Sequence, residues 1–315
     1  MPKVSVIIPN YNHAVYLKQR IDSVLNQSYT DYELIILDDC STDNSKEIIE
    51  QYRDNEKLTS IVYNEVNTGN SFKQWDKGIQ LAKGKYIWIA ESDDWCEKNF
   101  LETIIAGMEK KENVVFGYCQ SICVNDKGEI IFQSGYPRLE DYYPSDKFLE
   151  DFLCFGNAVY NASMAVFKKS FYLRISDTYK QFQFAGDKIF WAELSRLGDV
   201  YISGKLLNYF RKHSGDVSGK MYAKGSNFIE EIKVLDHFHM QLGLDERMYF
   251  RAKVKLYNNF RLVRTHIDQS LKTQIQKLFF KNISFFKSQY FLTLSYLYFL
   301  KTCLNKKLNR PYKTR

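Results

Sequence analysis

The first part of the chain alternates between short apolar runs and stretches with helical spacing. Four apolar runs are typical of strands, at residues 4–8, 34–37, 60–63 and 86–90. Between them apolar residues recur every three or four positions, which is typical of helices. Asn44, with Glu47 three residues later, predicts where one of these helices begins. Strands that are apolar throughout and separated by helices predict a mostly parallel sheet flanked by helices on both faces.

The pattern changes after residue 113. Residues 114–118 and 129–132 flank a turn at 125–128, which predicts an antiparallel hairpin. Helical spacing returns late in the chain and then continues. The fold class that follows is α/β with a helical C-terminal extension. The predicted domains are 1–225, with halves 1–112 and 113–225, and 226–315.

Charge divides the chain in a similar way. The 44 Lys and Arg residues outnumber the 37 Asp and Glu residues and give a net charge of +7. From Arg251 onward there are 15 basic residues and one acidic residue, Asp268, so the preceding part is acidic overall. A basic, aromatic helical tail is typical of peripheral contact with an anionic membrane, and equally of a helical cap that packs on the preceding domain. Its apolar run 290–300 is too short to span a bilayer, which needs about 20 residues.

Composition narrows the remaining classes. No nucleic-acid module accompanies the basic tail, so we expect no nucleic-acid partner. The six cysteines form no CxxC pair, which argues against a zinc site and a disulfide framework. The N-terminus lacks the pattern of a signal peptide, so we expect a cytoplasmic location, with the tail as a peripheral contact to the inner face of the membrane.

Polar clusters follow three of the predicted strands. These clusters are residues 10–12, 38–39 and 91–94. In an open parallel sheet, ligands bind at the carboxyl ends of the strands, so the clusters are expected to meet. Crowded carboxylates repel each other unless a cation joins them, and Mg²⁺ or Mn²⁺ commonly bridges carboxylates to phosphates. The glycine-rich phosphate loops GxG and GxxxxGK[ST] do not occur. The sequence therefore predicts a site for a metal-bound diphosphate that side chains hold.

The same residues resemble glycosyltransferase family 2. The segments that carry the resemblance are Pro9-Asn10-Tyr11-Asn12, Asn26-Gln27, Asp38-Asp39-Cys40-Ser41, Asn67-Thr68-Gly69, Lys83-Gly84-Lys85-Tyr86-Ile87 and Glu91-Ser92-Asp93-Asp94. They cover residues 3–110, and weaker similarity continues to about 220. The resemblance implies a GT-A fold, with 1–112 as the nucleotide-binding half, 113–225 as the acceptor-binding half, and inversion at the anomeric carbon.

The resemblance also implies roles for individual residues. Residues implied to bind the nucleotide are Pro9, Tyr11, Asp38, Asp39, Asn67, Gly69 and Asp93. Within that set, the Tyr11 ring is implied to stack on uracil, Asp39 to accept a hydrogen bond from the base, and Asp38 to orient its loop. Asp93, Asp94 and His213 are the implied metal ligands for Mn²⁺ or Mg²⁺, with the direct carboxylate ligand left open between the two aspartates.

Two further matches lie downstream. The segment Phe184-Ala185-Gly186-Asp187 resembles the family's catalytic-base segment, which implies that Asp187 removes the proton from the acceptor hydroxyl. Arg211 and Lys212 precede His213 and are implied to offset charge on the diphosphate. Two departures stand out: Glu91 occupies a position where Asp is common, and Gly186 precedes the base where an acidic residue is frequent.

The resulting hypothesis is an inverting, metal-dependent hexosyl- or N-acetylhexosaminyltransferase. It takes its sugar from a nucleotide sugar, expected to be a UDP-sugar, and transfers it to a hydroxyl of a glycan or lipid-linked acceptor in surface polysaccharide synthesis. One alternative is a sugar-phosphate nucleotidyltransferase, although such an enzyme is expected to carry a glycine-rich, basic N-terminal loop. The other is a non-catalytic, membrane-associated protein that keeps the nucleotide pocket, and donor hydrolysis separates it from an enzyme.

Overall fold

The chain forms two compact units, Met1–Asp216 and Val217–Arg315. The structure, a computed structural model, describes residues 1–281 and 285–307. Helix α8 (Val217–Lys224) belongs to the second unit. The units therefore divide after Asp216, whereas the sequence placed the boundary after residue 225.

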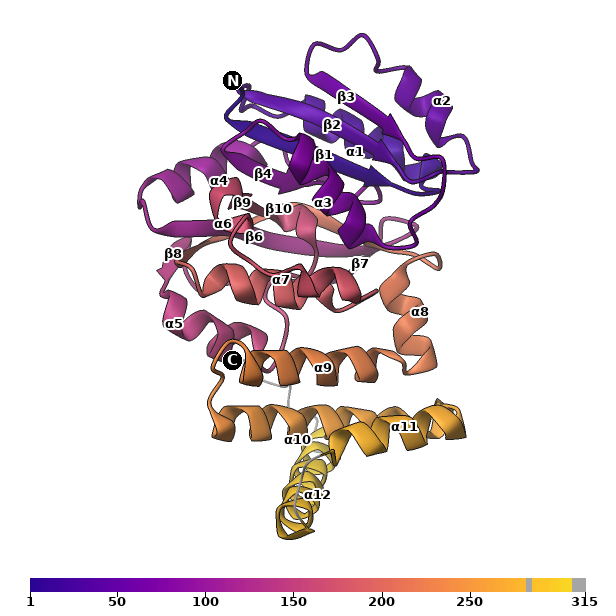
Figure 1. Ribbon diagram of the computed structural model, residues 1–315, viewed down its shortest axis with the longest axis vertical. Helices are drawn as coiled ribbons and strands as arrows, with labels where there is room; N and C mark the ends of the chain where they lie inside the picture. Colours follow the sequence, from indigo (N-terminus) through magenta and orange to yellow (C-terminus); the bar gives the residue numbers. More distant parts are fainter. Residues whose placement is uncertain (282–284, 308–315) are drawn as a thin grey trace. The chain divides into compact units, whose positions relative to one another are not determined.

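Four parallel strands begin the sheet of the first unit (Figure 1). In spatial order they are β3 (Leu58–Tyr63), β2 (Tyr32–Asp38), β1 (Val4–Asn10) and β4 (Tyr86–Ile89). The helices between them are α1 (Ala14–Leu25), α2 (Ser45–Glu50) and α3 (Ser71–Leu81). All residues of β1, β2 and β4 are buried, as expected for strands covered on both faces. The predicted parallel architecture is confirmed.

The sheet continues with strands of mixed direction. Next to β4 lie β9 (Ala165–Lys168), β6 (Val114–Asn125), β10 (Asp199–Lys212) and β5 (Trp95–Cys96). Strand β10 runs parallel to β6, while β9 is antiparallel to both β4 and β6. The predicted hairpin is present, because β7 (Ile130–Gln133) pairs antiparallel with the end of β6. A last strand, β8 (Glu140–Tyr143), pairs with β10.

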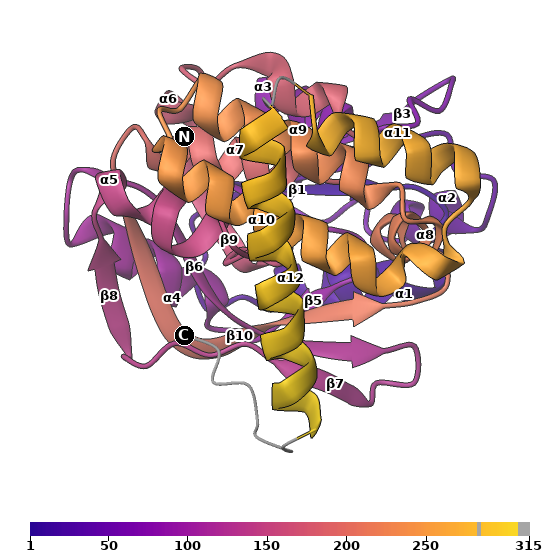
Figure 2. The same ribbon diagram turned by 90° about the horizontal axis from the view of Figure 1, so that it is seen from below.

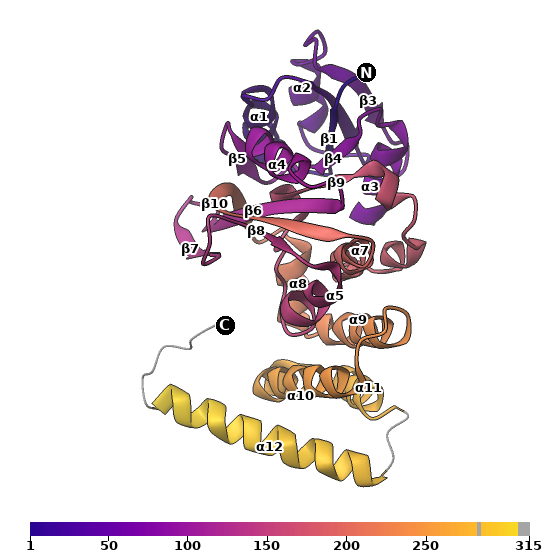
Figure 3. The ribbon, with the colours of Figure 1, turned by 90° about the vertical axis from the view of Figure 1, so that its left-hand side faces the viewer.

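Helices cover both faces of this sheet (Figure 3). On one face α1 and α4 (Phe100–Glu109) pack over Trp88, whose ring contacts Phe100 and the Arg20 guanidinium. On the other face α3 and α7 (Gly186–Ser195) meet through Trp75 and Phe190, with ring centroids 5.6 Å apart. Two short helices, α5 (Ser145–Phe148) and α6 (Lys169–Tyr172), complete the unit's α-helices.

The start of α2 differs in detail from the prediction. Asn44 makes no side-chain cap hydrogen bond. Asp43 takes that role instead, because its carboxylate accepts from the backbone N–H of Ser45 at 3.0 Å and of Ala14 at 2.9 Å. A single carboxylate therefore joins the starts of two helices.

The second unit is helical throughout its described residues. After α8 come α9 (Asn227–Met240), α10 (Glu246–Val263), α11 (Gln269–Phe279) and α12 (Phe285–Lys307). Helix α12 crosses α10 (Figure 2), where Phe250 and Tyr257 contact Phe291. Asp245 and Asp268 cap α10 and α11. Among the described residues, no helix has the length and apolar character needed to cross a membrane.

Candidate active site

The loops that follow β1 and β2 are tied to each other. The buried Asp38 carboxylate accepts from Asn10 Nδ2 at 2.7 Å and from Ser41 Oγ at 2.6 Å. Asn12, in the left-handed region at φ 55°, accepts from the Thr42 backbone N–H at 2.7 Å. The Asp38 carboxylate therefore links the loop after β1 to the loop after β2. Tyr11, in the loop after β1, remains 46% exposed.

Asp39 faces a different set of neighbours. Its carboxylate accepts from Asn64 Nδ2 at 2.6 Å, from Gln74 Nε2 at 2.9 Å, and from the Thr68 backbone and hydroxyl. Oδ1 takes most of these bonds, and Oδ2 is bonded to Thr68. The protein thus satisfies this carboxylate largely by itself.

The loop after β3 closes around the same aspartate. Asn67 Nδ2 donates to the Asp39 carbonyl at 2.9 Å, and Asn67 Oδ1 accepts from the Gly69 N–H at 2.7 Å. Gly69 adopts φ 64°, which favours glycine. Pro9, buried in β1, pairs with Leu37 of β2. Apart from Asp93, which follows β4, the residues implied to bind the nucleotide therefore gather at the carboxyl ends of β1, β2 and β3.

The two aspartates after β4 have separate environments. Asp94 is 2% exposed and accepts from Ser163 Oγ at 2.7 Å, from the Arg211 N–H at 3.0 Å and from Asn161 Nδ2. Burial beside Asp93 raises the pKa of Asp94 to about 7, whereas its three hydrogen-bond partners all donate and so stabilise the ionised form. Asp94 is bound into the protein.

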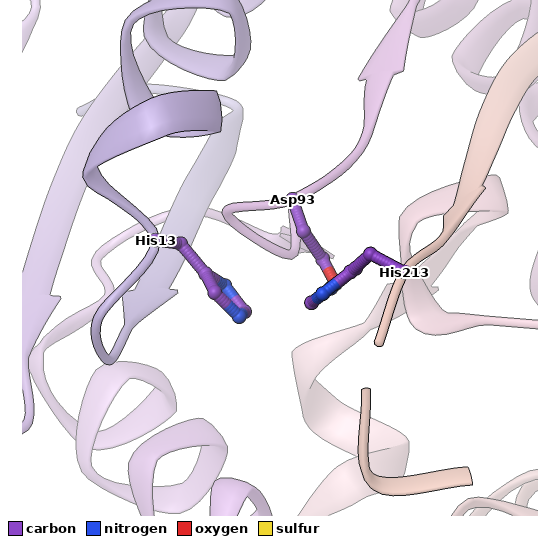
Figure 4. Close-up of side chains that lie close together, drawn as sticks. All are labelled: His13, Asp93 and His213. Carbon is purple, nitrogen blue, oxygen red and sulfur yellow. The ribbon is translucent and has the colours of Figure 1, made fainter. Parts of the chain in front are cut away.

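Asp93 instead meets two histidines. One ligand atom each from His13, Asp93 and His213 lies within 4.8 Å of the others (Figure 4). His213 Nε2 is 3.1 Å from Asp93 Oδ2, and this hydrogen bond raises the pKa of His213. The Gly215 N–H donates to His213 Nδ1 at 3.2 Å, so Nε2 carries the proton that Asp93 accepts. These three residues form the histidine–aspartate cluster.

The cluster fits a divalent cation. Two imidazole nitrogens and a carboxylate oxygen converge from three separate elements (Figure 4). Such a ligand set suits transition metals, which accept nitrogen as well as oxygen. Of the implied metal ligands, Asp93 and His213 belong to the cluster and Asp94 does not. His13 was missed by the sequence analysis, although it directly follows the first polar cluster.

Arg211 and Lys212 are engaged with protein groups. The Arg211 guanidinium lies 4.6 Å from the ring centroids of both Tyr16 and Trp95, and its Nε donates to the Asp93 carbonyl at 3.0 Å. Lys212 Nζ is 3.7 Å from Asp216. Arg211 therefore positions the Asp93 loop, and the implied diphosphate contacts stay predictions.

Asp187 lies in the first turn of α7, and the Lys188 N–H donates to its Oδ1 at 2.8 Å. Burial raises the pKa of Asp187 to about 6, and a hydrogen bond with Asn157 acts in the opposite direction. Asn157 lies four residues before Asn161, which bonds Asp94. Four extended residues span at most about 14 Å. The segment 157–161 thus links Asp187, the implied base, to Asp94, one of the implied metal ligands.

The sequence did not predict the hydrogen bond between Trp75 of α3 and Glu91 in the loop after β4. Trp75 Nε1 donates to Glu91 Oε1 at 2.7 Å, and burial raises the pKa of Glu91 to about 8. Glu91 therefore joins α3 to the loop after β4, which carries Asp93 and Asp94. No local sequence signal identifies this partnership, because the two residues come from separate elements.

Comparison with known proteins identifies the family. The model of "Glycosyl transferase family 2" matches residues 5–174. An uncharacterized glycosyltransferase of Haemophilus influenzae is 26% identical over 280 residues, which are 86% of this chain and 83% of that protein. The Staphylococcus aureus poly(ribitol-phosphate) beta-N-acetylglucosaminyltransferase TarS is 25% identical and covers 88% of this chain, and the putative Bacillus subtilis teichuronic acid biosynthesis glycosyltransferase TuaG is 41% identical over 32% of it. The matched stretches span 47% of TarS and 40% of TuaG.

Solved structures share the fold. TarS 1–349 in complex with UDP-GlcNAc has a TM-score of 0.60 at 20% identity, over 84% of this chain and 74% of that one. The Pyrobaculum calidifontis mannosyltransferase PcManGT, in complex with GDP-Man and Mn²⁺, has a TM-score of 0.55 at 13% identity, over 95% of this chain and 87% of that one. At these identities the likeness concerns the fold alone.

Proposed function

This chain belongs to glycosyl transferase family 2 and has its GT-A fold, and we propose that it transfers a sugar, with inversion, from a UDP-sugar to a hydroxyl of a cell-surface glycan acceptor. The observation that carries the proposal is the meeting of three loops at one sheet edge. The loops after β1 and β2 present the exposed Tyr11 ring, and the loop after β4 presents Asp93 to the histidines.

The donor end is proposed as a nucleobase pocket. Tyr11 offers an exposed aromatic face on the loop after β1, which hydrogen bonds of Asp38 and Asn12 tie to the loop after β2. A base stacked on such a ring gains about 1–3 kcal/mol. The UDP-GlcNAc bound to TarS supports uracil as the base, while the GDP-Man bound to PcManGT makes guanine the competitor to test.

The metal end uses Asp93 and His213. A divalent ion bound there supplies positive charge to the departing nucleoside diphosphate. Asp93 is held in place for this purpose, because Arg211 binds its carbonyl and His213 its carboxylate. Despite burial, which acts to raise it, the hydrogen bond from His213 lowers the pKa of Asp93. Asp93 therefore remains an anionic ligand.

Asp187 is proposed as the general base. The acceptor oxygen attacks C1, the bond from C1 to the diphosphate oxygen breaks, and the hydroxyl proton passes to Asp187. A single displacement inverts the configuration at C1. A carboxylate with a pKa of about 6 is ionised at neutral pH and is a stronger base than an ordinary aspartate. General-base catalysis of this kind contributes about 10²–10⁴-fold.

The acceptor is proposed to be a glycan, free or lipid-linked. Phe132 and Tyr160 are both exposed, with ring centroids 5.5 Å apart, and Tyr160 precedes the Asn161 that binds Asp94. These two exposed rings are suited to packing against the apolar face of a sugar. By their names, TarS acts on poly(ribitol-phosphate) and TuaG is a putative glycosyltransferase of teichuronic acid biosynthesis, which supports this class of acceptor.

Peripheral contact of α12 with an anionic membrane belongs to the same proposal. Among its described side chains, Tyr296 is 53% and Leu297 56% exposed. Exposed apolar residues on a basic helix suit insertion into a lipid surface. We expect the double variant Leu297→Ser/Leu300→Ser to float less with anionic liposomes than the parent chain, and Val66→Ser, a change at another exposed residue, to float like it. Equal flotation of all three proteins would remove the membrane contact from the proposal.

The central test measures binding and turnover separately. UDP, GDP and the corresponding nucleotide sugars are added with Mn²⁺, and the melting temperature and nucleotide release are recorded. UDP compounds should raise the melting temperature, since a ligand of the native state stabilises it. Release of UDP from a UDP-sugar should follow, and Asp93→Asn should abolish it. Binding without any turnover would favour the non-catalytic alternative. A rise in melting temperature with GDP compounds alone would show that the donor is a GDP-sugar and not a UDP-sugar.

A further inference from the structure

We propose that His13 is a third protein ligand of the catalytic metal, so that the site binds Mn²⁺ before any nucleotide arrives and prefers it to Mg²⁺. The inference rests on the proposed function and deepens it. It follows from the histidine–aspartate cluster, in which His13, from the loop after β1, lies close to Asp93, from the loop after β4, and to His213.

The spacing of the three side chains suits one ion. Two ligands on opposite sides of an ion with bonds of about 2.1 Å are about 4.2 Å apart, and adjacent ligands are about 3 Å apart. His213 Nε2 and Asp93 Oδ2, at 3.1 Å, already have the adjacent spacing. All three ligand atoms lie within 4.8 Å of one another. A small rotation of one side chain is enough to bring them to the spacing of ligands around a single ion.

His13 is held in a way that is common for metal ligands. Its Nδ1 lies 2.8 Å from Ser92 Oγ, and Ser92 is 1% exposed. A histidine that binds metal through one ring nitrogen usually donates its other N–H to an oxygen. With Nδ1–H donated to Ser92, Nε2 is the ring nitrogen that we assign to the ion.

Neighbouring rings restrict both imidazoles. The His13 and His213 ring centroids are 5.3 Å apart with an edge contact, and the Tyr16 ring lies 5.1 Å from His213 and 6.1 Å from His13. Tyr16 is itself fixed, because its hydroxyl donates to Asp126 at 2.8 Å. An ion that binds His213 Nε2 takes the place of the proton now shared with Asp93.

The donor set determines which ion is favoured. Mg²⁺ requires oxygen ligands, keeps several waters and usually binds through one or two carboxylates plus substrate phosphates. Imidazole nitrogens instead favour transition metals. An ion held by three protein atoms also does not need the diphosphate in order to bind. With His13 as a ligand, the protein alone supplies enough ligands to bind the ion, and the substrate diphosphate is not needed for metal binding.

The test titrates Mn²⁺ into the nucleotide-free full chain and follows free Mn²⁺ by electron paramagnetic resonance. The parent chain should bind one equivalent, His13→Gln should bind at least about tenfold more weakly, and His266→Gln, at an exposed histidine of the second unit, should match the parent. Ser92→Ala keeps all three ligands and should weaken binding by a smaller factor. Co²⁺ should displace bound Mn²⁺, and an equal concentration of Mg²⁺ should not.

Several outcomes would overturn the inference. Equal Mn²⁺ affinity in His13→Gln and the parent chain would remove His13 from the site. Mn²⁺ binding that appears only with UDP would show that substrate completes the site, and displacement by equal Mg²⁺ would refute the stated preference. Circular dichroism confirms that each variant folds. Failure of the function itself is a different result, namely a parent chain that never turns over a nucleotide sugar with any metal.

Discussion

Replacing Asp187 by asparagine is expected to slow sugar transfer strongly and to make the folded chain more stable. Burial raises the pKa of Asp187 from the usual 3.8 to about 6. Between these two values the folded chain holds a proton that the unfolded chain has lost, so the free energy of unfolding falls as pH rises. Above the folded pKa the full cost is present, and a shift of this size corresponds to at most about 3 kcal/mol. Asparagine carries no charge and avoids that cost.

The same pKa determines how transfer depends on pH. A base with a pKa of about 6 is about half ionised at pH 6 and about one tenth ionised at pH 5. Transfer by the parent chain should therefore fall about tenfold for each unit below pH 6. Asp187→Asn should lose about 10²–10⁴-fold at neutral pH, while UDP affinity stays unchanged because the residue is assigned to the acceptor hydroxyl and not to the nucleotide.

Three measurements test this reasoning. Transfer rate against pH, UDP affinity by calorimetry and melting temperature at pH 4 and pH 7.5 are compared among the parent, Asp187→Asn and Asp177→Asn. Asp177 has an 81% exposed side chain, so its variant is the matched control and should follow the parent. A neutral-pH transfer rate in Asp187→Asn equal to that of the parent would refute the base role. The melting temperature of Asp187→Asn should exceed that of the parent by more at pH 7.5 than at pH 4, and an equal difference at the two pH values would refute the assigned burial cost.

Three further substitutions probe other parts of the first unit. Tyr11→Ala should raise the UDP dissociation constant by about 5–100-fold, since it removes a stacking surface; calorimetry that detects no change would count against stacking. Asn157→Ala removes a hydrogen bond that lowers the pKa of Asp187, so the acid limb of the rate profile should move to higher pH, and an unmoved limb would argue against that contact. Gly107→Ala would put a Cβ 2.1 Å from the Tyr201 ring and should lower the free energy of unfolding by about 1–3 kcal/mol in urea titration, with an unaltered midpoint as the contrary result.

The parallel half of the sheet could be predicted because its signals are local. A strand buried on both faces needs an unbroken apolar run, and the helices between such strands need apolar residues at helical spacing. Strand β9 had no comparable signal. It is four residues long, lies in an irregular aromatic stretch, and is a strand because β4 and β6 offer unpaired edges on both sides.

The candidate site was predicted as a set of loops but not as a set of contacts. Asp93 and Asp94 are adjacent, and the sequence left the direct ligand open between them. Asn161, Ser163 and Arg211 bind Asp94, whereas Asp93 faces the histidines. Those partners come from segments far along the chain.

Asp39 gives a second example of the same limit. The sequence implied a contact with the base, which stays a prediction. The structure adds that Asn64, Thr68 and Gln74 already bind its carboxylate. Whether a carboxylate faces a ligand or the protein depends on where distant donors lie, and residue type does not encode that position.

The amino-acid sequence by itself determined the strands, the helices between them and the polar residues at the strand ends, because burial imposes a period that neighbouring residues carry. Only the tertiary structure decided that His13 faces Asp93 and His213, that Arg211 lies between two rings, and that the segment 157–161 links Asp187 to Asp94. These arrangements depend on loops from separate strands meeting at one sheet edge. Their geometry is set by the packing of the whole unit.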